Sequence, residues 1–466
     1  MMNANLKALR AAATNASIAS RCLATQAAPK SAASHSSSHS SSSKPGEVKI
    51  SSMPSGASIA SVASDSALAR VAIVFKAGAR YEPADQLGLT HALRLTAGQS
   101  TENHTSFGLV RNIDYFGGRL VVAGTRDTVT YLLEVHNDEE ILPRNFALLA
   151  ETVARPAFKR WELPDNTERA LAELSILEDN PHIKLAEALH AVAWKGGLRK
   201  SLYMPRFMLN KHTGEQLKKF IANRYVSPVV VGVGVEHQQL VDLVGSHLSG
   251  LSSHQPPKCV TSFIGGETHL EAASPLTYVA LATEGVGLKN TKEALALSLF
   301  QTILGNGPQI ASFSGLSSNT RLGKAVGAAL GGKSSDNVAV SAFNFAYEET
   351  GLFGINLIAP KSSDVTGLLK AAVKELRAAA SSVTDAELAD AKKNLKTAAL
   401  LAVDTGDALA TELGAQLALV GSQVDTAKEV DAITAADVKS VAGRLLKGKL
   451  ALATIGPNAP YLDDLV

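Results

Sequence analysis

The chain has 466 residues, of which 45% are hydrophobic and 19% charged, so it can form two to three domains with a substantial core. Its formal net charge at pH 7 is +2, which gives no reason to expect a nucleic-acid partner. With only Cys22 and Cys259, a disulfide framework and a cysteine-based zinc site are both excluded.

The first 46 residues differ in composition from the rest. They carry five Lys or Arg residues and no acid, and the first carboxylate is that of Glu47. An acid-poor start that contains Ser and Arg is typical of a mitochondrial transit peptide, which we expect over residues 1–23, followed by a Ser-rich flexible linker over 24–46. A disordered basic tail is the alternative. Without these five positive charges, the net charge of +2 becomes −3.

The pattern of the next 200 residues predicts an α+β domain. Alternating hydrophobic residues predict strands over 70–75, 119–123 and 128–135. Helical periodicity predicts helices over 141–155, 166–178 and 183–194.

A capping box, Thr213 with Gln216, predicts the start of another helix. The stretch VVVGVGV (229–235) then predicts a buried strand, and it is far shorter than the ~18 apolar residues of a membrane-spanning helix. We therefore expect a soluble protein or one that is peripheral to a membrane.

The pattern then repeats after a polar, proline-containing segment. Strands are predicted over 276–282, 341–348 and 354–359, and helices over 363–380 and from Thr384 onward. The segment 434–456 resembles 213–234 at an offset of 221 residues, which indicates two copies of one domain. We expect homologous α+β domains, each a mostly antiparallel sheet packed against helices, over 47–250 and 263–466, with a linker over 251–262.

One predicted helix, GLTHALRLTAG (88–98), contains part of a metal-binding pattern. Two His residues four positions apart on a helix can share a zinc ion, and a Glu between them can act as general base. Here only His91 is present, because Arg94 takes the place of the base and Leu95 that of the second His. Leu95 has no lone pair and Arg94 is a permanent cation, so the residues predict no catalytic site and no bound metal or other cofactor.

The stretch GlyLeuThrHisAlaLeuArgLeu (88–95) resembles the pitrilysin-type metallopeptidases, or inverted zincins, whose motif is Gly-x-x-His-x-x-Glu-His. The resemblance implies that His91 matches the first zinc ligand, Arg94 the general base and Leu95 the second ligand. Glu173 is the best match to the family's distal Glu ligand, and Glu178 is the alternative. Two further stretches support the resemblance, AspAsnProHis (179–182) and LeuHisAlaValAlaTrp (189–194).

Within this family, ArgTyrGluPro (80–83) and LeuGlyAsnGlyPro (304–308) resemble the branch of core subunits in ubiquinol–cytochrome c reductase, respiratory complex III. That resemblance implies a non-catalytic scaffold subunit that supports electron transfer from ubiquinol to cytochrome c. It also implies a peripheral position on the matrix side of the mitochondrial inner membrane. The implied partners are core subunit 1, as a heterodimer, and the cytochrome b, cytochrome c1 and iron–sulfur subunits.

Two other functions remain as alternatives. One is a non-catalytic, presequence-binding α-type subunit of the mitochondrial processing peptidase, although residues 304–315 contain only three Gly in twelve, few for the glycine-rich loop of that subunit. The other is an active metallopeptidase with different ligands. His182, Glu187 and His190 lie on one predicted helix, but eight residues separate the two His and no base is placed between them.

Overall fold

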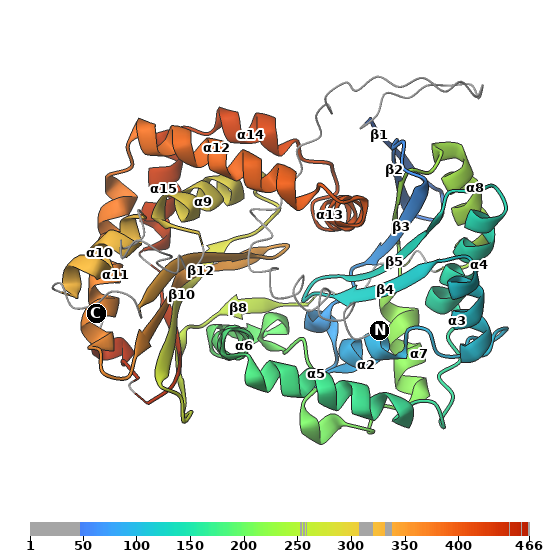
Figure 1. Cartoon of the computed structure of the whole chain (residues 1–466), viewed down its shortest axis with the longest axis horizontal. Helices are drawn as coiled ribbons and strands as arrows, with labels where there is room; N and C mark the ends of the chain where they lie inside the picture. Colours follow the sequence, from blue (N-terminus) through green and yellow to red (C-terminus); the bar gives the residue numbers. More distant parts are fainter. Residues whose placement is uncertain are drawn as a thin grey trace.

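The computed structural model describes residues 47–464, apart from 252–253, 255–256, 258, 307–319, 331–337, 447 and 458. The predicted transit peptide and Ser-rich linker lie outside the described residues. The chain forms two α+β halves that lie side by side in Figure 1, and we call them the first half (47–251) and the second half (259–464).

The first half contains a sheet of six strands: β1 (Val48–Ser52), β2 (Ser58–Val62), β3 (Leu68–Phe75), β4 (Arg119–Gly124), β5 (Val129–His136) and β7 (Val229–Val233). Their order in the sheet is β1-β2-β7-β3-β5-β4. Neighbouring strands are antiparallel except β2 and β7, which are parallel.

The second half contains a sheet of five strands: β9 (Gly266–Leu270), β10 (Leu276–Val286), β11 (Ala339–Ala346), β12 (Thr350–Pro360) and β13 (Leu450–Ile455). Read from β9, the order is β9-β13-β10-β12-β11, which repeats β2-β7-β3-β5-β4 of the first sheet. The pair β9 and β13 is parallel, as β2 and β7 are. The expected pair of homologous, mostly antiparallel α+β domains is therefore confirmed.

Helices surround both sheets. Those of the first half are α2 (Leu89–Thr96), α3 (Ser106–Tyr115), α4 (Ile141–Ala154), α5 (Thr167–Asp179), α6 (Pro181–Ala193), α7 (Gly214–Arg224) and α8 (His237–His247). Those of the second half are α9 (Thr291–Leu304), α10 (Arg321–Ala329), α11 (Val365–Ser381), α12 (Asp385–Ala402), α13 (Gly406–Leu419), α14 (Thr426–Ala432) and α15 (Ala435–Leu445). No helix within the described ranges has the length and apolar character needed to cross a bilayer.

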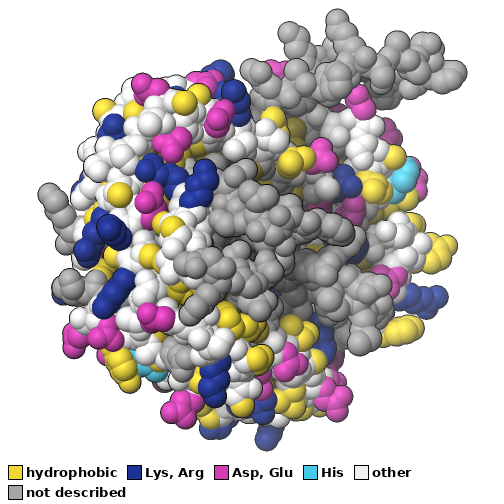
Figure 2. All heavy atoms as spheres, turned by 60° about the vertical axis from the view of Figure 1, so that its left-hand side comes forward, with side chains coloured by type: hydrophobic (Ala, Val, Ile, Leu, Met, Phe, Trp, Pro, Cys, Tyr) yellow, Lys and Arg dark blue, Asp and Glu magenta, His cyan; other side chains and the backbone are white. Residues whose placement is uncertain are grey.

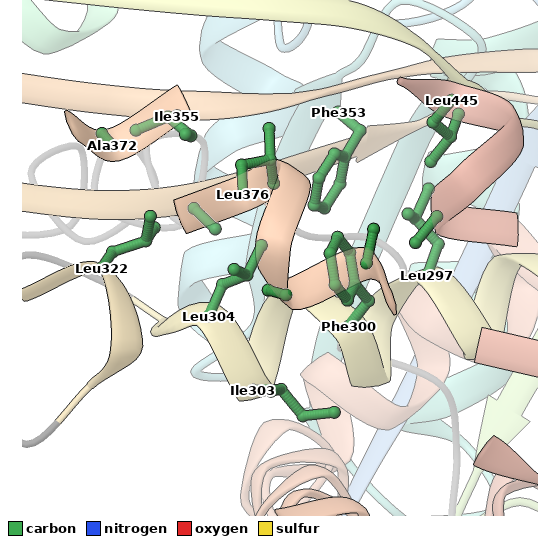
Figure 3. Close-up of a cluster of buried hydrophobic side chains, with 14 of the residues drawn as sticks. Leu297, Phe300, Ile303, Leu304, Leu322, Phe353, Ile355, Ala372, Leu376 and Leu445 are labelled. Carbon is green, nitrogen blue, oxygen red and sulfur yellow. The ribbon is translucent and has the colours of Figure 1, made fainter. Parts of the chain in front are cut away.

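Both faces of each sheet are buried. In β3, Val71, Ile73 and Phe75 pack toward a cluster that includes residues of α4, α7 and α8, as the alternation predicted. The corresponding cluster of the second half, built around Phe300 of α9 and Phe353 of β12, is drawn in Figure 3. Because Ala72 and Val74 of β3 are buried on the opposite face, that face also needs a cover.

The two halves supply these covers to each other. Helix α13, from the second half, packs with Ala410 and Leu413 on the free face of the first sheet. Helix α6, from the first half, packs with Leu185 and Leu189 on the free face of the second sheet. In Figure 1, α13 lies beside β3 and α6 lies below β10. Each hydrophobic core is thus completed by a helix of the other half.

A buried ion pair fixes the junction between the halves. The Nη1 atom of Arg80 lies 2.8 Å from Oδ1 of Asp127, and both side chains are almost fully buried. The other carboxylate oxygen of Asp127 accepts the backbone N–H of Glu348, in the turn between β11 and β12, at 3.0 Å. Arg80 also donates to Thr261 of the short strand β8 (Thr261–Phe263), at 3.1 Å. The ends of two hairpins, one from each sheet, therefore meet on one salt bridge.

Candidate functional site

The helix that carries the incomplete zinc motif is α2, and its position depends on Gly88. Gly88 has φ +78°, a left-handed conformation that favours glycine, and a Cβ there would lie 2.3 Å from Cα of Met204. The backbone of the segment around Met204 can therefore approach the first turn of α2 closely. This contact brings a backbone N–H to His91.

A buried carboxylate caps the start of α2. Glu82 accepts the backbone N–H groups of Gly88 and Thr90, each at 2.8 Å, which are donors that lack helical partners. Burial raises the pKa of Glu82 to about 7, although the hydrogen bonds from Thr90 and Gly88 act to lower it. Sequence reasoning missed Glu82, because it lies six residues before the glycine, outside the usual N-cap position.

The structure brings three of the predicted motif residues together. Nε2 of His91 lies 2.9 Å from Oε2 of Glu173 on α5, and Nη1 of Arg94 lies 3.2 Å from Oε1 of the same carboxylate. The other terminal nitrogen of Arg94 bonds to Oε2, so the guanidinium holds the carboxylate through both terminal nitrogens. Burial acts to raise the pKa of Glu173, but the hydrogen bond from His91 and the charge of Arg94 lower it to about 2.

The hydrogen bonds of His91 determine its tautomer. Nδ1 of His91 accepts the backbone N–H of Met204 at 3.0 Å, so this nitrogen carries no proton. The proton of the neutral ring then lies on Nε2, which donates to Glu173. Burial lowers the pKa of His91 and favours this neutral form. The single in-plane lone pair of this neutral ring lies on Nδ1 and already accepts the N–H of Met204, so His91 offers no lone pair to a metal ion.

The remaining motif residue, Leu95, points away from this polar group. Its side chain is 2% exposed and packs with Ala170 of α5 and with Met204. Its backbone carbonyl accepts a hydrogen bond from Arg169, at 3.1 Å. The second ligand position of the family motif is therefore part of a small hydrophobic cluster between α2 and α5.

The alternative residues named from the sequence are not assembled into a site. Glu178 forms an exposed ion pair with Arg206, at 2.7 Å. Glu187 binds Arg126, also at 2.7 Å, while Nε2 of His190 lies 2.6 Å from the hydroxyl of Tyr347. His182 stacks edge-on against Tyr278. Within the residues that the structure describes, no group of three His, Cys, Asp or Glu side chains is arranged to hold a metal.

Two family models match the chain over most of its length. Residues 58–206 match the model described as insulinase, peptidase family M16, and residues 211–395 match the model described as peptidase M16 inactive domain. The first match contains all four motif positions, from His91 to Glu173.

Individual relatives fall into two groups. The chain is 31% identical to rat cytochrome b-c1 complex subunit 2, mitochondrial, over 85% of this chain and 87% of the relative. The human protein of the same name is 29% identical over the same shares. The mitochondrial-processing peptidase subunit alpha of Solanum tuberosum is 30% identical, over 83% of this chain and 77% of the relative.

Proposed function

Because the chain belongs to the insulinase family of peptidases, family M16, and is similar to cytochrome b-c1 complex subunit 2 along most of its length, we propose that it is a non-catalytic core subunit of respiratory complex III. In this role it serves as a scaffold that supports electron transfer from ubiquinol to cytochrome c. The observation that carries the proposal is the 31% identity over 85% of the chain.

The site supports the non-catalytic part of the proposal. A zinc peptidase needs three ligands and a base that activates the metal-bound water. In this chain the base position holds Arg94, whose guanidinium cannot accept a proton, and a ligand position holds Leu95. The remaining acid, Glu173, is neutralised by Arg94. The chain is therefore not itself a peptidase.

The relatives and the fold support the proposed surroundings of the chain. The cytochrome b-c1 relatives are named as mitochondrial, and no described helix can cross a membrane. We place the chain at the matrix side of the mitochondrial inner membrane as a peripheral subunit. Its proposed partners are core subunit 1, as a heterodimer, and the cytochrome b, cytochrome c1 and iron–sulfur subunits.

Affinity isolation of a tagged full-length chain from mitochondria in mild detergent tests this assignment. We expect the chain to copurify with haem-containing cytochromes and with ubiquinol–cytochrome c reductase activity. Because the chain is also similar to processing peptidase subunit alpha, the experiment must distinguish that protein from a complex III subunit. Recovery of a soluble heterodimer that cleaves presequences, without haem, would assign the chain to the processing peptidase instead.

A further inference from the structure

Exposed aromatic side chains are concentrated in one part of the first half. Among the described residues, five aromatic side chains are more than half exposed: Tyr115 at 78%, Phe107 at 75%, Trp161 at 71%, Phe207 at 62% and Tyr461 at 55%. All but Tyr461 belong to three segments, residues 106–116, 155–163 and 205–219. We call these segments the basic aromatic face.

Hydrogen bonds show that the three segments are neighbours. The backbone N–H of Ala157 donates to the carbonyl of Ser100 at 3.0 Å, and the hydroxyl of Ser100 accepts the N–H of Ser106, at the start of α3, at 3.1 Å. On the other side, Gly214 packs against Phe158, and a Cβ at Gly214 would lie 2.6 Å from the carbonyl oxygen of Phe158. The segment with Trp161 therefore lies between α3 and the segment with Phe207.

The basic aromatic face is positively charged. Its three segments contain eight Lys or Arg residues and three Asp or Glu, whereas the whole chain beyond residue 46 carries a net charge of −3. Among the described residues, no carboxylate forms a salt bridge with five of these cations, all of which are exposed: Arg111, Arg155, Arg160, Lys211 and Lys219. By contrast, the side of the molecule shown in Figure 2 has basic and acidic side chains interspersed.

Aromatic rings and cations also occur here as pairs. The ammonium of Lys159 lies 5.9 Å from the centre of the Trp161 ring, and that of Lys211 lies 6.0 Å from the centre of the Phe207 ring. Trp, Tyr and Phe beside Lys and Arg are the residues that enter the headgroup region of a bilayer, where the ring meets the acyl boundary and the cation meets phosphate. The rings lie on a helix, a loop and a short 3-10 helix, η5 (Arg206–Met208), which suits a deformable lipid surface.

We propose that the basic aromatic face lies directly against the anionic phospholipid surface of the membrane. This inference rests on the proposed function for its choice of a membrane as the anionic partner. The exposed rings insert at headgroup depth, and the unpaired cations bind lipid phosphate. Each cation near an anionic surface contributes roughly 1 kcal/mol, or about fivefold in partitioning.

Tryptophan fluorescence of the full-length chain tests the proposal. The chain has two tryptophans, of which Trp161 is 71% exposed and Trp194 is fully buried. On addition of vesicles of phosphatidylcholine with cardiolipin, we expect the emission of Trp161 to shift to shorter wavelength and to be quenched by brominated acyl chains. Trp161→Phe should remove the whole response. Residues 1–46 also carry five cations, but vesicle binding through them alone leaves Trp161 in water.

Charge variants provide the matched comparison. Arg111→Gln with Arg160→Gln should weaken the Trp161 response at least tenfold in vesicle concentration. Lys393→Gln with Lys428→Gln removes the same charge from the second half, where these side chains are 78% and 77% exposed, and should leave the response unchanged.

Three results would overturn the proposal. The first is sedimentation with anionic vesicles without any change in Trp161 emission. The second is an equal response to vesicles of pure phosphatidylcholine. The third is a Trp161 response to single-stranded RNA or to isolated complex III subunits but not to anionic vesicles. The first two results leave open whether the chain copurifies with the cytochromes, so this test and that of the proposed function can fail separately.

Discussion

At the residue scale, the guanidinium of Arg94 gives Glu173 the positive partner that a zinc ion provides in the metallopeptidase motif. Glu173 is bound on both oxygens by Arg94 and on one by His91, so the carboxylate already has a positive partner that is covalently part of the chain. Restoring a zinc site therefore requires more than replacing Leu95. It also requires removing the guanidinium that neutralises Glu173.

We predict that Leu95→His alone yields neither bound zinc nor peptidase activity. His91 stays bonded through both nitrogens, and Arg94 keeps a positive charge beside the metal position. Metal analysis after dialysis against zinc, together with hydrolysis of a fluorogenic basic peptide, measures both properties. Arg94→Glu with Leu95→His is the matched comparison. It removes the guanidinium, but His91 keeps its bond to the N–H of Met204, so we expect zinc to bind more than in the single variant and still below one ion per chain. Stoichiometric zinc in the single variant would contradict this account.

Glu173→Gln should lower the free energy of unfolding at pH 7 by about 2–3 kcal/mol, because it leaves Arg94 and His91 without their charged acceptor. The folded-state pKa of Glu173 is about 2, below its ordinary value of 4.5, so its contribution is complete above pH 4.5 and is lost as the pH falls toward 2. Urea denaturation at several pH values should show the difference between wild type and variant shrinking only below about pH 4.5.

Glu178→Gln is the control for that experiment. Glu178 and its partner Arg206 are 49% and 61% exposed, and exposed pairs of this kind contribute less than about 1 kcal/mol. We expect a small change in the unfolding free energy. A loss as large as that of Glu173→Gln would mean that the effect is not specific to the carboxylate held by Arg94 and His91, and would contradict this account.

At the element scale, the sequence predicted where the strands and helices lie better than which elements pack against one another. The strands expected over 70–75, 119–123 and 128–135 match β3, β4 and β5 closely. The capping box at Thr213 begins α7 as expected. Alternation shows which residues share one side of a strand, but it does not show what covers the other side. The exchange of α6 and α13 depends on contacts between residues more than 70 positions apart, for which a single sequence has no local signal.

The candidate site was predictable to a similar extent. The resemblance placed His91, Arg94 and Glu173 in one site, and these side chains do touch. It gave no indication that Glu82 caps α2 or that the N–H of Met204 binds His91. Both interactions use backbone N–H groups, which every sequence contains. The basic aromatic face was also invisible, because its charges are spread over three segments and offset by acids elsewhere.

Gly414 should be needed for the close packing of α13 against the first sheet. A Cβ at this position would lie 2.6 Å from a methyl carbon of Val74, so Gly414→Ala forces the helix away from β3. We expect a loss of about 1–3 kcal/mol in unfolding free energy. Gly443→Ala, in α15, meets nothing within 4 Å and should be neutral or stabilising by up to about 1 kcal/mol. Thermal denaturation of both variants checks the contrast, and equal effects would contradict it.

At the scale of the whole molecule, the two halves form one structural unit. They share the helices α6 and α13, and they share the buried pair of Arg80 and Asp127. This construction suits a scaffold subunit, because a rigid connection between the halves keeps the binding surfaces of both halves at fixed relative positions.

Asp127→Asn should lower the unfolding free energy by about 3–5 kcal/mol, because it leaves the buried charge of Arg80 with only the half-exposed carboxylate of Glu349, 3.5 Å away, as a counterion. Both halves should lose stability together, which hydrogen exchange of amides in β5 and in β12 can measure. Glu293→Gln is the control. Glu293 pairs with Arg444, the two side chains are 36% and 59% exposed, and the variant should change the unfolding free energy by less than about 1 kcal/mol. Destabilisation confined to β5 would show that the junction does not couple the halves.

The exchanged helices also constrain the order in which the molecule can mature. If the chain enters the mitochondrion N-terminus first, as its predicted transit peptide implies, the six strands of the first sheet arrive by residue 233, yet the helix that covers the open face of this sheet ends only at residue 419. For almost 190 residues of import, a hydrophobic surface rich in valine and alanine lacks its native cover. Folding of this protein therefore finishes late, and chaperones that hold unfinished chains have a defined surface to protect until α13 arrives.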